Sequence, residues 1–267
     1  MNSSENFLAY WLGFADGNNI TAVPRSPNIV AVAFGVTDTD STIGTAFLTS
    51  KHSLQDILDG ARELKRGGQR VVLSINGAVQ QDKGWASLDP EKFARNAHEL
   101  IVGQWGWDGI DLDNEDPGPP AANFPKVIRA LRRRFGAKSL ITLPVYLGIE
   151  RDAYLKDVKD DIDAVSTMAY WNDYEGQIAL YEQYATLVGN AKVAIGVSNP
   201  GSGDNSTPGG AVHRLAAYDP PGGKYGMMFW NVNSPQNPRQ AMEWCETIAA
   251  HLPGAEKLSP AAVGKND

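Results

Sequence analysis

The segment Asp108-Gly109-Ile110-Asp111-Leu112-Asp113-Asn114-Glu115-Asp116-Pro117 alternates acidic and apolar side chains over a stretch of strand length. Alternate side chains of a β-strand share a face, so Asp111, Asp113 and Glu115 are expected on one face and the apolar side chains on the other. In a closed β/α barrel the apolar face meets the helices and the acidic face points inward. Glu115 lies nearest the carboxyl end of this strand, which is the end where barrel active sites are built.

Carboxylates spaced about 6–7 Å apart along a strand cannot all ionise cheaply in a packed interior. Neighbouring like charges raise at least one pKa, which allows a carboxylic acid to remain protonated near neutral pH. The pattern therefore suits a general acid, and Glu115 is the best candidate for that role. An acidic surface loop is an alternative, but such a loop would not alternate so strictly with isoleucine and leucine.

A metal site is the second alternative, because Asp and Glu at strand ends bind Mg²⁺ or Ca²⁺ through oxygen. An EF-hand loop is excluded because Asp116 stands where that loop requires glycine. A magnesium site in a barrel collects carboxylates from several strands, and Asp173 is the one other acid at an obvious strand end. We expect neither a metal nor a cofactor.

Eight short runs rich in β-branched and aromatic residues recur along the chain and have the length of strands. They are Phe7–Phe14, Ile29–Val36, Arg70–Ile75, Gly109–Asp113, Ser139–Tyr146, Ala164–Tyr170, Lys192–Val197 and Tyr225–Val232. Helical stretches are expected after Ser53 and after Asp89, and over Ala121–Phe135, Arg151–Lys159, Glu175–Val188, Gly210–Tyr218 and Asn237–His251. This alternation predicts an α/β protein with a single (β/α)8 TIM barrel, and no Gly-x-Gly-x-x-Gly follows the first strand to favour a dinucleotide fold.

The length of 267 residues allows one catalytic domain over residues 1–267, with residues 258–267 as a loose tail. Hydrophobic residues make up 42% and charged residues 21%, as in globular proteins. No apolar run reaches the roughly 18–20 residues that cross a bilayer, so no membrane partner is expected. The N-terminal residues show no signal-peptide pattern, and the single cysteine, Cys245, is interpreted as a buried, inert thiol.

The net charge of −7 argues against a nucleic-acid partner, since such proteins usually carry a basic excess or a basic stripe. The densest basic cluster comprises Arg129, Arg132, Arg133 and Arg134. We interpret this cluster as a solvated helix face.

The acidic segment resembles the D-x-x-D-x-D-x-E signature of family 18 glycoside hydrolases, which include chitinases, endo-β-N-acetylglucosaminidases and catalytically inactive lectins. Segments at other strands agree in order with that family. Ser74-Ile75-Asn76-Gly77 resembles S-x-G-G with asparagine in place of the first glycine, Met168-Ala169-Tyr170 resembles M-x-Y, and Gly226–Trp230 resembles the last strand, whose tryptophan floors the sugar site. Ala9-Tyr10-Trp11 and Val32-Ala33-Phe34 fit the first two strands, so the resemblance spans nearly the whole chain.

The chain departs from the family pattern at three points. Trp171 follows the tyrosine of M-x-Y, where the family usually has Asp or Asn, and Asn172 and Asp173 come next. Asn114 stands where chitinases commonly carry an aromatic or aliphatic residue, and a polar residue there resembles the endo-β-N-acetylglucosaminidase branch. The small α+β insertion before the eighth strand is absent, as in compact, endo-acting members.

The resemblance implies a substrate-assisted mechanism without a protein nucleophile. Glu115 would protonate the leaving oxygen and later act as base, Asp113 would bind the acetamido N–H of the sugar, and Asp111 would share a proton with Asp113. Tyr170 would hold the acetamido oxygen in line. Trp230 would stack under the sugar, and the other expected substrate-binding residues are Met168, Tyr10, Phe34, Asn172 and Trp171.

The resemblance thus implies endo-hydrolysis of β-1,4-linked N-acetylglucosamine polymers by a chitinase that is expected to be monomeric and extracellular, although a cytoplasmic location stays open. Its expected partner is chitin or an oligosaccharide that contains N-acetylglucosamine. Three alternatives stay open: an endo-β-N-acetylglucosaminidase that cuts the chitobiose core of N-glycans, a chito-oligosaccharide-binding lectin, and a metal-dependent lyase or isomerase on the same barrel.

Overall fold

The computed structural model describes residues 6–79, 84–115, 122–146, 148–198, 211–233 and 238–253, with side chains from residue 241 in the last range. Eight parallel strands form a closed barrel, because β1 pairs with both β2 and β9. The strands are β1 (Asn6–Leu12), β2 (Ile29–Thr37), β4 (Arg70–Asn76), β5 (Gly109–Asp113), β6 (Leu140–Val145), β7 (Ala164–Thr167), β8 (Val193–Ser198) and β9 (Gly226–Trp230). The short strand β3 (Ile43–Gly44) adds to β2 in antiparallel orientation. The predicted (β/α)8 barrel is confirmed.

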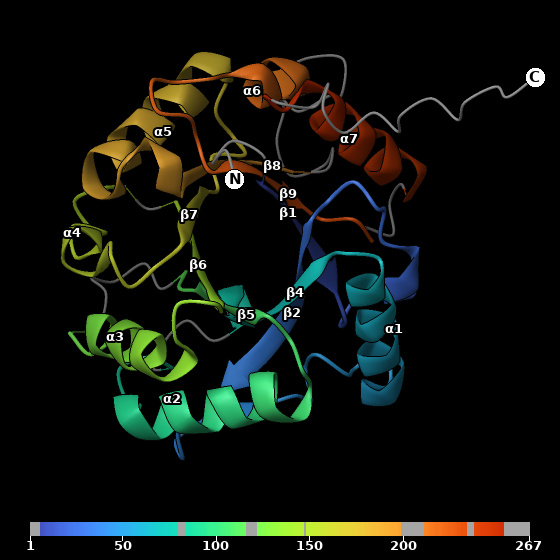
Figure 1. Ribbon diagram of the computed structural model, residues 1–267, viewed down its shortest axis with the longest axis vertical. Helices are drawn as coiled ribbons and strands as arrows, with labels where there is room; N and C mark the ends of the chain where they lie inside the picture. Colours follow the sequence, from blue (N-terminus) through green and yellow to red (C-terminus); the bar gives the residue numbers. More distant parts are fainter. Residues whose placement is uncertain are drawn as a thin grey trace, which may run out of the picture.

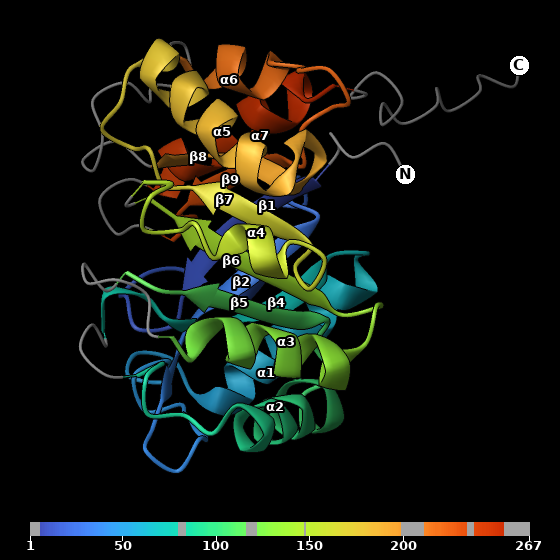
Figure 2. The same ribbon diagram turned by 90° about the vertical axis from the view of Figure 1, so that its left-hand side faces the viewer.

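Helices surround the strands, as Figure 1 shows. They are α1 (Leu54–Arg66), α2 (Pro90–His98), α3 (Phe124–Phe135), α4 (Leu155–Val158), α5 (Tyr174–Val188), α6 (His213–Ala217) and α7 (Pro238–His251). A π-helical segment, Glu99–Gln104, continues α2, and short 3₁₀ turns cover Ile20–Ala22, Gly77–Val79 and Asn190–Lys192. In the side view of Figure 2 the strands lie between α5–α7 above and α1–α3 below. None of the described helices is long and apolar enough to span a bilayer.

Two helix starts follow the sequence prediction. The side chain of Ser53 accepts the N–H of Asp56, and the side chain of Asp89 accepts the N–H of Lys92. The predicted helix over Arg151–Lys159 is wrong in extent, because the helix covers only Leu155–Val158. Residues 149–154 form turns in place of the first part of the predicted helix. Within these turns the buried side chain of Asp152 accepts a 2.6 Å hydrogen bond from Tyr184 Oη, which holds this part of the chain against α5.

The apolar residues form two layers, one between the strands and the helices and one inside the barrel. Ile110 and Leu112 belong to the outer layer, whereas Asp111 contacts side chains of β1, β4 and β6 in the interior. The period-two pattern of the acidic segment therefore has the predicted orientation. Cys245 is fully buried in α7, and burial raises the pKa of its thiol, as expected for an inert cysteine.

A repeated hydrogen bond closes the amino end of the barrel. The residue just before a strand accepts the N–H of the second residue of the preceding strand. Asn28 pairs in this way with Phe7, Asp108 with Val71, and Asp163 with Ile141, each at 2.8 Å. These side chains fix where neighbouring strands begin and so help to set their register.

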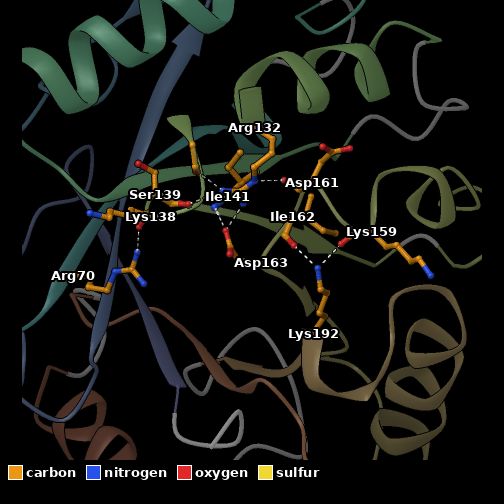
Figure 3. Close-up of polar contacts among 11 residues, drawn as sticks. Arg70, Arg132, Lys138, Ser139, Ile141, Lys159, Asp161, Ile162, Asp163 and Lys192 are labelled. Atoms are coloured by element: carbon orange, nitrogen blue, oxygen red, sulfur yellow. Dashed lines mark hydrogen bonds and ion pairs between the residues drawn. The ribbon is translucent and has the colours of Figure 1, made fainter. Parts of the chain in front are cut away.

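The interpretation of the arginine cluster as a solvated face needs correction at Arg132. Its Nη2 lies 2.5 Å from Asp163 Oδ2, and the guanidinium also donates to the carbonyls of Ser139 and Asp161 (Figure 3). It donates to the carbonyl of Gly136 as well. The Arg132 side chain is only 15% exposed. It ties α3 to the starts of β6 and β7, and no sequence pattern marks that partner because Asp163 lies in another β/α unit.

Candidate active site

The first acid of β5, Asp111, lies on the floor of the site and accepts hydrogen bonds from three strands. Its Oδ2 accepts from Tyr10 Oη at 2.8 Å and from Ser74 Oγ at 2.7 Å, and its Oδ1 accepts from Thr142 Oγ1 at 2.6 Å. Burial raises the pKa of Asp111 to about 6, although the three hydroxyl donors act against that rise. These bonds make Asp111 an anchor of the barrel interior, and its predicted proton sharing with Asp113 stays a prediction.

The second acid, Asp113, is 2% exposed, and its Oδ1 has no hydrogen-bond partner among the described residues. Burial raises its pKa well above the ordinary value, and the nearby carboxylates of Glu115 and Asp111 raise it further. An ionised carboxylate without a partner costs free energy when it is buried. Asp113 is therefore favoured in its protonated form, or in contact with a hydrogen-bond donor of a bound ligand.

The third acid, Glu115, is partly exposed at the mouth of the barrel. Burial raises its pKa, and a hydrogen bond from the backbone N–H of Ala78 acts in the opposite direction. Glu115 and Asp113 interact strongly enough to titrate as a pair, so the first proton leaves more readily than the second. The rise in pKa favours the protonated form of Glu115, which is the form that a general acid requires.

A cavity of about 230 Å³ opens beside these acids. Its lining residues are Asp113, Glu115, Tyr146, Met168, Tyr170, Trp171 and Trp230. Burial and the three carboxylates raise the pKa of Tyr170 well above the ordinary value, so its hydroxyl stays protonated and able to donate. Trp171 is 66% exposed at the rim and stands 6.4 Å from the ring of Tyr146. The cavity thus combines two carboxyl groups, phenol donors and apolar faces.

Aromatic rings support the cavity from behind. The ring of Tyr10 lies 5.2 Å from that of Trp230, and the ring of Phe34 lies 5.9 Å away in a stacked arrangement. Tyr10 and Phe34 are almost fully buried and are not among the lining residues, so they support Trp230 and do not face the cavity. The structure therefore brings Trp230, Met168, Trp171 and Tyr170 to the cavity wall, and their substrate-binding and catalytic roles stay predictions.

Asn172, a predicted substrate-binding residue, lies outside the cavity lining. It is exposed at the start of α5, where its N–H donates to the carbonyl of Ala169 and its carbonyl accepts from Gln177 Nε2 at 3.3 Å. These contacts give Asn172 a role in the turn between β7 and α5.

Sequence reasoning missed two residues that hold the end of β5. Tyr146 lines the cavity and its hydroxyl donates to the carbonyl of Glu115 at 3.4 Å. Arg151, whose side chain is 10% exposed, places Nη1 and Nη2 each 3.4 Å from the carbonyl of Asn114. The position of Tyr146 at the end of a predicted strand was an available signal, whereas Arg151 falls in a stretch expected to be a regular helix.

Two carboxyl groups at the carboxyl end of a (β/α)8 barrel, in a cavity walled by aromatic rings, are typical of enzymes that hydrolyse glycosides. The family model described as "Glycosyl hydrolases family 18" matches residues 6–199, which is more than half of the chain. The chain belongs to that family. No curated protein matches the sequence.

Solved structures give the same fold at low identity. A family 18 chitinase from Pseudoalteromonas aurantia superposes with a TM-score of 0.73 at 19% identity, over 92% of this chain and 100% of that one. An endo-beta-N-acetylglucosaminidase from Cordyceps militaris gives 0.68 at 20% identity, over 93% and 91%. A family 18 chitinase from Cycas revoluta, solved in complex with (GlcNAc)3, gives 0.72 at 14% identity, over 95% and 100%.

Proposed function

We propose that this protein is a chitinase, a retaining endo-hydrolase of β-1,4-linked N-acetylglucosamine polymers. The observation that carries the proposal is that Glu115, Asp113 and Tyr170 line one cavity together with Trp230. Family membership and the chitinases among the structural neighbours support the same substrate class.

The proposed reaction begins when Glu115 gives its proton to the glycosidic oxygen that leaves. The substrate's own acetamido carbonyl oxygen attacks the anomeric carbon, so that a cyclic oxazolinium ion forms as the glycosidic bond breaks. Glu115, now a carboxylate, then takes a proton from the water that opens this ring. Two displacements at one carbon leave the product in the β configuration.

Asp113 is suited to accept the acetamido N–H, because its buried Oδ1 has no partner among the described residues. A negative charge at this position also stabilises the positive charge that develops on the oxazolinium ring. The protonated hydroxyl of Tyr170 donates to the acetamido oxygen and holds it in line for attack. Trp230 offers its ring to the C–H face of the sugar, and Trp171 extends the apolar surface to the rim.

The test is cleavage of chito-oligosaccharides by the wild type and by Glu115→Gln. Loss of a positioned acid lowers kcat by at least about 10²-fold. Glu63→Gln on α1 is the matched control, because Glu63 is exposed and does not line the cavity. This variant should retain the kcat of wild type. Full activity of the Glu115 variant would refute the assignment of the acid.

A second candidate is an endo-β-N-acetylglucosaminidase that acts on N-glycans. Asn114 favours it, since this polar residue departs from the usual chitinase residue and lies between the two cavity carboxylates, with its carbonyl bound by Arg151. Incubation with a high-mannose glycoprotein decides between the two: release of the glycan supports this candidate, and no release excludes it. Binding of chito-oligosaccharide without turnover on any substrate would instead indicate a lectin.

A further inference from the structure

Strand β4 ends in a left-handed turn next to the acidic strand. Asn76, its last residue, has φ = 73°, and Gly77 follows with φ = 56°. Asn76 is fully buried and is the register partner of Asp113 on β5. Left-handed backbone is uncommon outside glycine, and asparagine tolerates it better than most residues. Asn76 stands where the S-x-G-G motif has glycine, so the turn has to be held by other means.

The side chain of Asn76 is bound to the end of β2. Its Oδ1 accepts the backbone N–H of Thr37 at 2.9 Å and the hydroxyl of Thr37 at 3.1 Å. Thr37 is 2% exposed, so both bonds are shielded from water. A Cβ on Gly84 would lie 2.7 Å from Thr37 Oγ1 and 2.9 Å from Asn76 Nδ2. The pair is therefore enclosed and has little room to rearrange.

The left-handed turn leads directly into the 3₁₀ turn Gly77–Val79, which packs against β5, and the backbone N–H of Ala78 lies near the Glu115 carboxylate there and acts to lower its pKa. Gly77 is confined as well, because a Cβ there would lie 2.6–2.9 Å from the ring of Phe34. If Asn76 took an ordinary strand conformation, the backbone after it would leave in another direction and Ala78 would no longer reach Glu115.

Other groups also face Glu115. Asp113 ends β5 two residues before Glu115, Tyr146 follows β6, and Tyr170 follows β7. Arg151 binds the carbonyl of Asn114, just before Glu115. In contrast to these groups, the backbone N–H of Ala78 acts to lower the pKa of Glu115 and so favours its ionised form.

We propose that Asn76 and Thr37 are positioning residues for the general acid: their hydrogen bonds hold the left-handed end of β4 and thereby aim the Ala78 N–H at Glu115. This inference rests on the proposed function, in which Glu115 gives up its proton and later accepts one. The N–H stabilises the carboxylate that forms when the proton leaves, and it fixes the direction of the side chain for both steps.

The test compares Asn76→Ala with Asn76→Gly. Alanine loses the Thr37 bonds and disfavours the left-handed backbone, whereas glycine loses the bonds but adopts that backbone freely. For Asn76→Ala we expect kcat to fall about tenfold or more with KM little changed, and the alkaline limb of the kcat/KM profile to move to higher pH. For Asn76→Gly we expect kcat within about threefold of wild type. Equal losses in the two variants, or no loss in either, would overturn the proposal.

Two variants of Thr37 disturb the structure less and keep the proposal testable if Asn76→Ala does not fold. Thr37→Val removes the hydroxyl bond and keeps the backbone bond, so the alkaline limb of its kcat/KM profile should move in the same direction as in Asn76→Ala, but less. Thr37→Ser keeps both bonds, and its alkaline limb should match that of wild type. Thr167→Val is the matched control, because Thr167 is equally buried and, among the described residues, its hydroxyl binds only the backbone of β8. A limb shift as large in Thr167→Val as in Thr37→Val would refute the role of the Thr37 bond.

A titration keeps this test separate from the proposed activity. The Glu115 carboxyl is followed by NMR in protein labelled with ¹³C at the glutamate carboxyl, with the signal assigned by its loss in Glu115→Gln. The Glu115 transition is expected at higher pH in Asn76→Ala than in wild type, and an unchanged transition would contradict the proposal. A wild type that cleaves no chito-oligosaccharide would refute the proposed function, and the titration would still decide the positioning of Glu115.

Discussion

The two ends of the barrel hold carboxylates in opposite environments. At the amino end, Asp163 accepts the N–H of Ile141 at 2.8 Å and pairs with Arg132, and Asp108 likewise accepts the N–H of Val71 and pairs with Lys65 at 2.8 Å. At the carboxyl end, Asp113 is buried without a partner for Oδ1 among the described residues, and burial raises its pKa.

This contrast separates stability from chemistry in one fold. A carboxylate whose charge is matched by an arginine or lysine and a backbone N–H fixes the start of a strand. A buried carboxyl group without such partners, like Asp113, has a raised pKa, and groups of this kind are typical of functional sites. In (β/α)8 barrels the carboxyl ends of the strands carry the active site and the amino ends serve stability, and here the pairing of the acids explains that division.

The largest effect is expected when the unmatched charge is removed. Asp113→Asn should lower kcat on chito-oligosaccharides by about 10²- to 10³-fold, because an amide cannot give up a proton and so cannot supply the negative charge that stabilises the oxazolinium ion. The same variant should unfold at higher denaturant concentration than wild type at pH 7, because the amide needs neither a buried charge nor the uptake of a proton on folding. A less stable Asp113→Asn protein would contradict the view that this acid costs stability.

The free energy of unfolding should depend on pH because Asp111, the innermost acid of the site, is buried. The folded protein holds the Asp111 proton more tightly than the unfolded chain, since burial raises its pKa to about 6. The folded state thus binds more protons, and the free energy of unfolding should fall as pH rises from about 4 through about 6, by about 3 kcal/mol from this group. Denaturant titrations of wild type and Asp111→Asn across this range measure the effect, and an equally steep fall in the variant would assign it elsewhere.

The matched charge at the amino end should behave in the opposite way. Asp163→Asn keeps an oxygen for the Ile141 N–H but removes the charge beside Arg132, and it should lower the free energy of unfolding by about 1 kcal/mol. Its kcat should stay within about twofold of wild type, because Asp163 lies at the end remote from the cavity. A large loss of kcat at unchanged stability would break the proposed division between the two ends.

The smallest effect is expected at the rim. Trp171→Ala should raise KM for longer chito-oligosaccharides by a few-fold, on the order of 1 kcal/mol of lost stacking, with little effect on the shortest substrates. Stability should not change, because the ring is 66% exposed. Comparing KM between short and long oligomers measures this, and an equal change for all lengths would place Trp171 elsewhere in the binding surface.

The barrel and the placement of its acids could be predicted because they depend on local patterns. Strict alternation around Ile110 and Leu112 fixes which face Asp111 takes, and a capping side chain such as Ser53 marks a helix start within four residues. For Tyr170 and Trp230 the expectation came from the family resemblance of the M-x-Y and Gly226–Trp230 segments and not from a local pattern, and both residues line the cavity.

Contacts between β/α units could not be predicted in this way. Arg132 lies 31 residues from Asp163, and Arg151 lies 37 residues from the Asn114 carbonyl that it binds. Their sequence surroundings read as ordinary helix, so only the closed barrel shows that they hold strand ends. Asn76 is a further example of a contact between units. Its left-handed backbone is accompanied by a hydrogen bond to Thr37, which lies 39 residues away in the sequence.

The configuration of the first-formed product tests the central claim most directly. Chito-oligosaccharide is mixed with wild-type enzyme, and the anomeric proton of the new reducing end is followed by NMR during the first minutes, before mutarotation. Substrate assistance with Glu115 as acid and then base predicts that the β-anomer appears first. Initial formation of the α-anomer would contradict the account, since it would require direct attack by water on the glycosidic carbon.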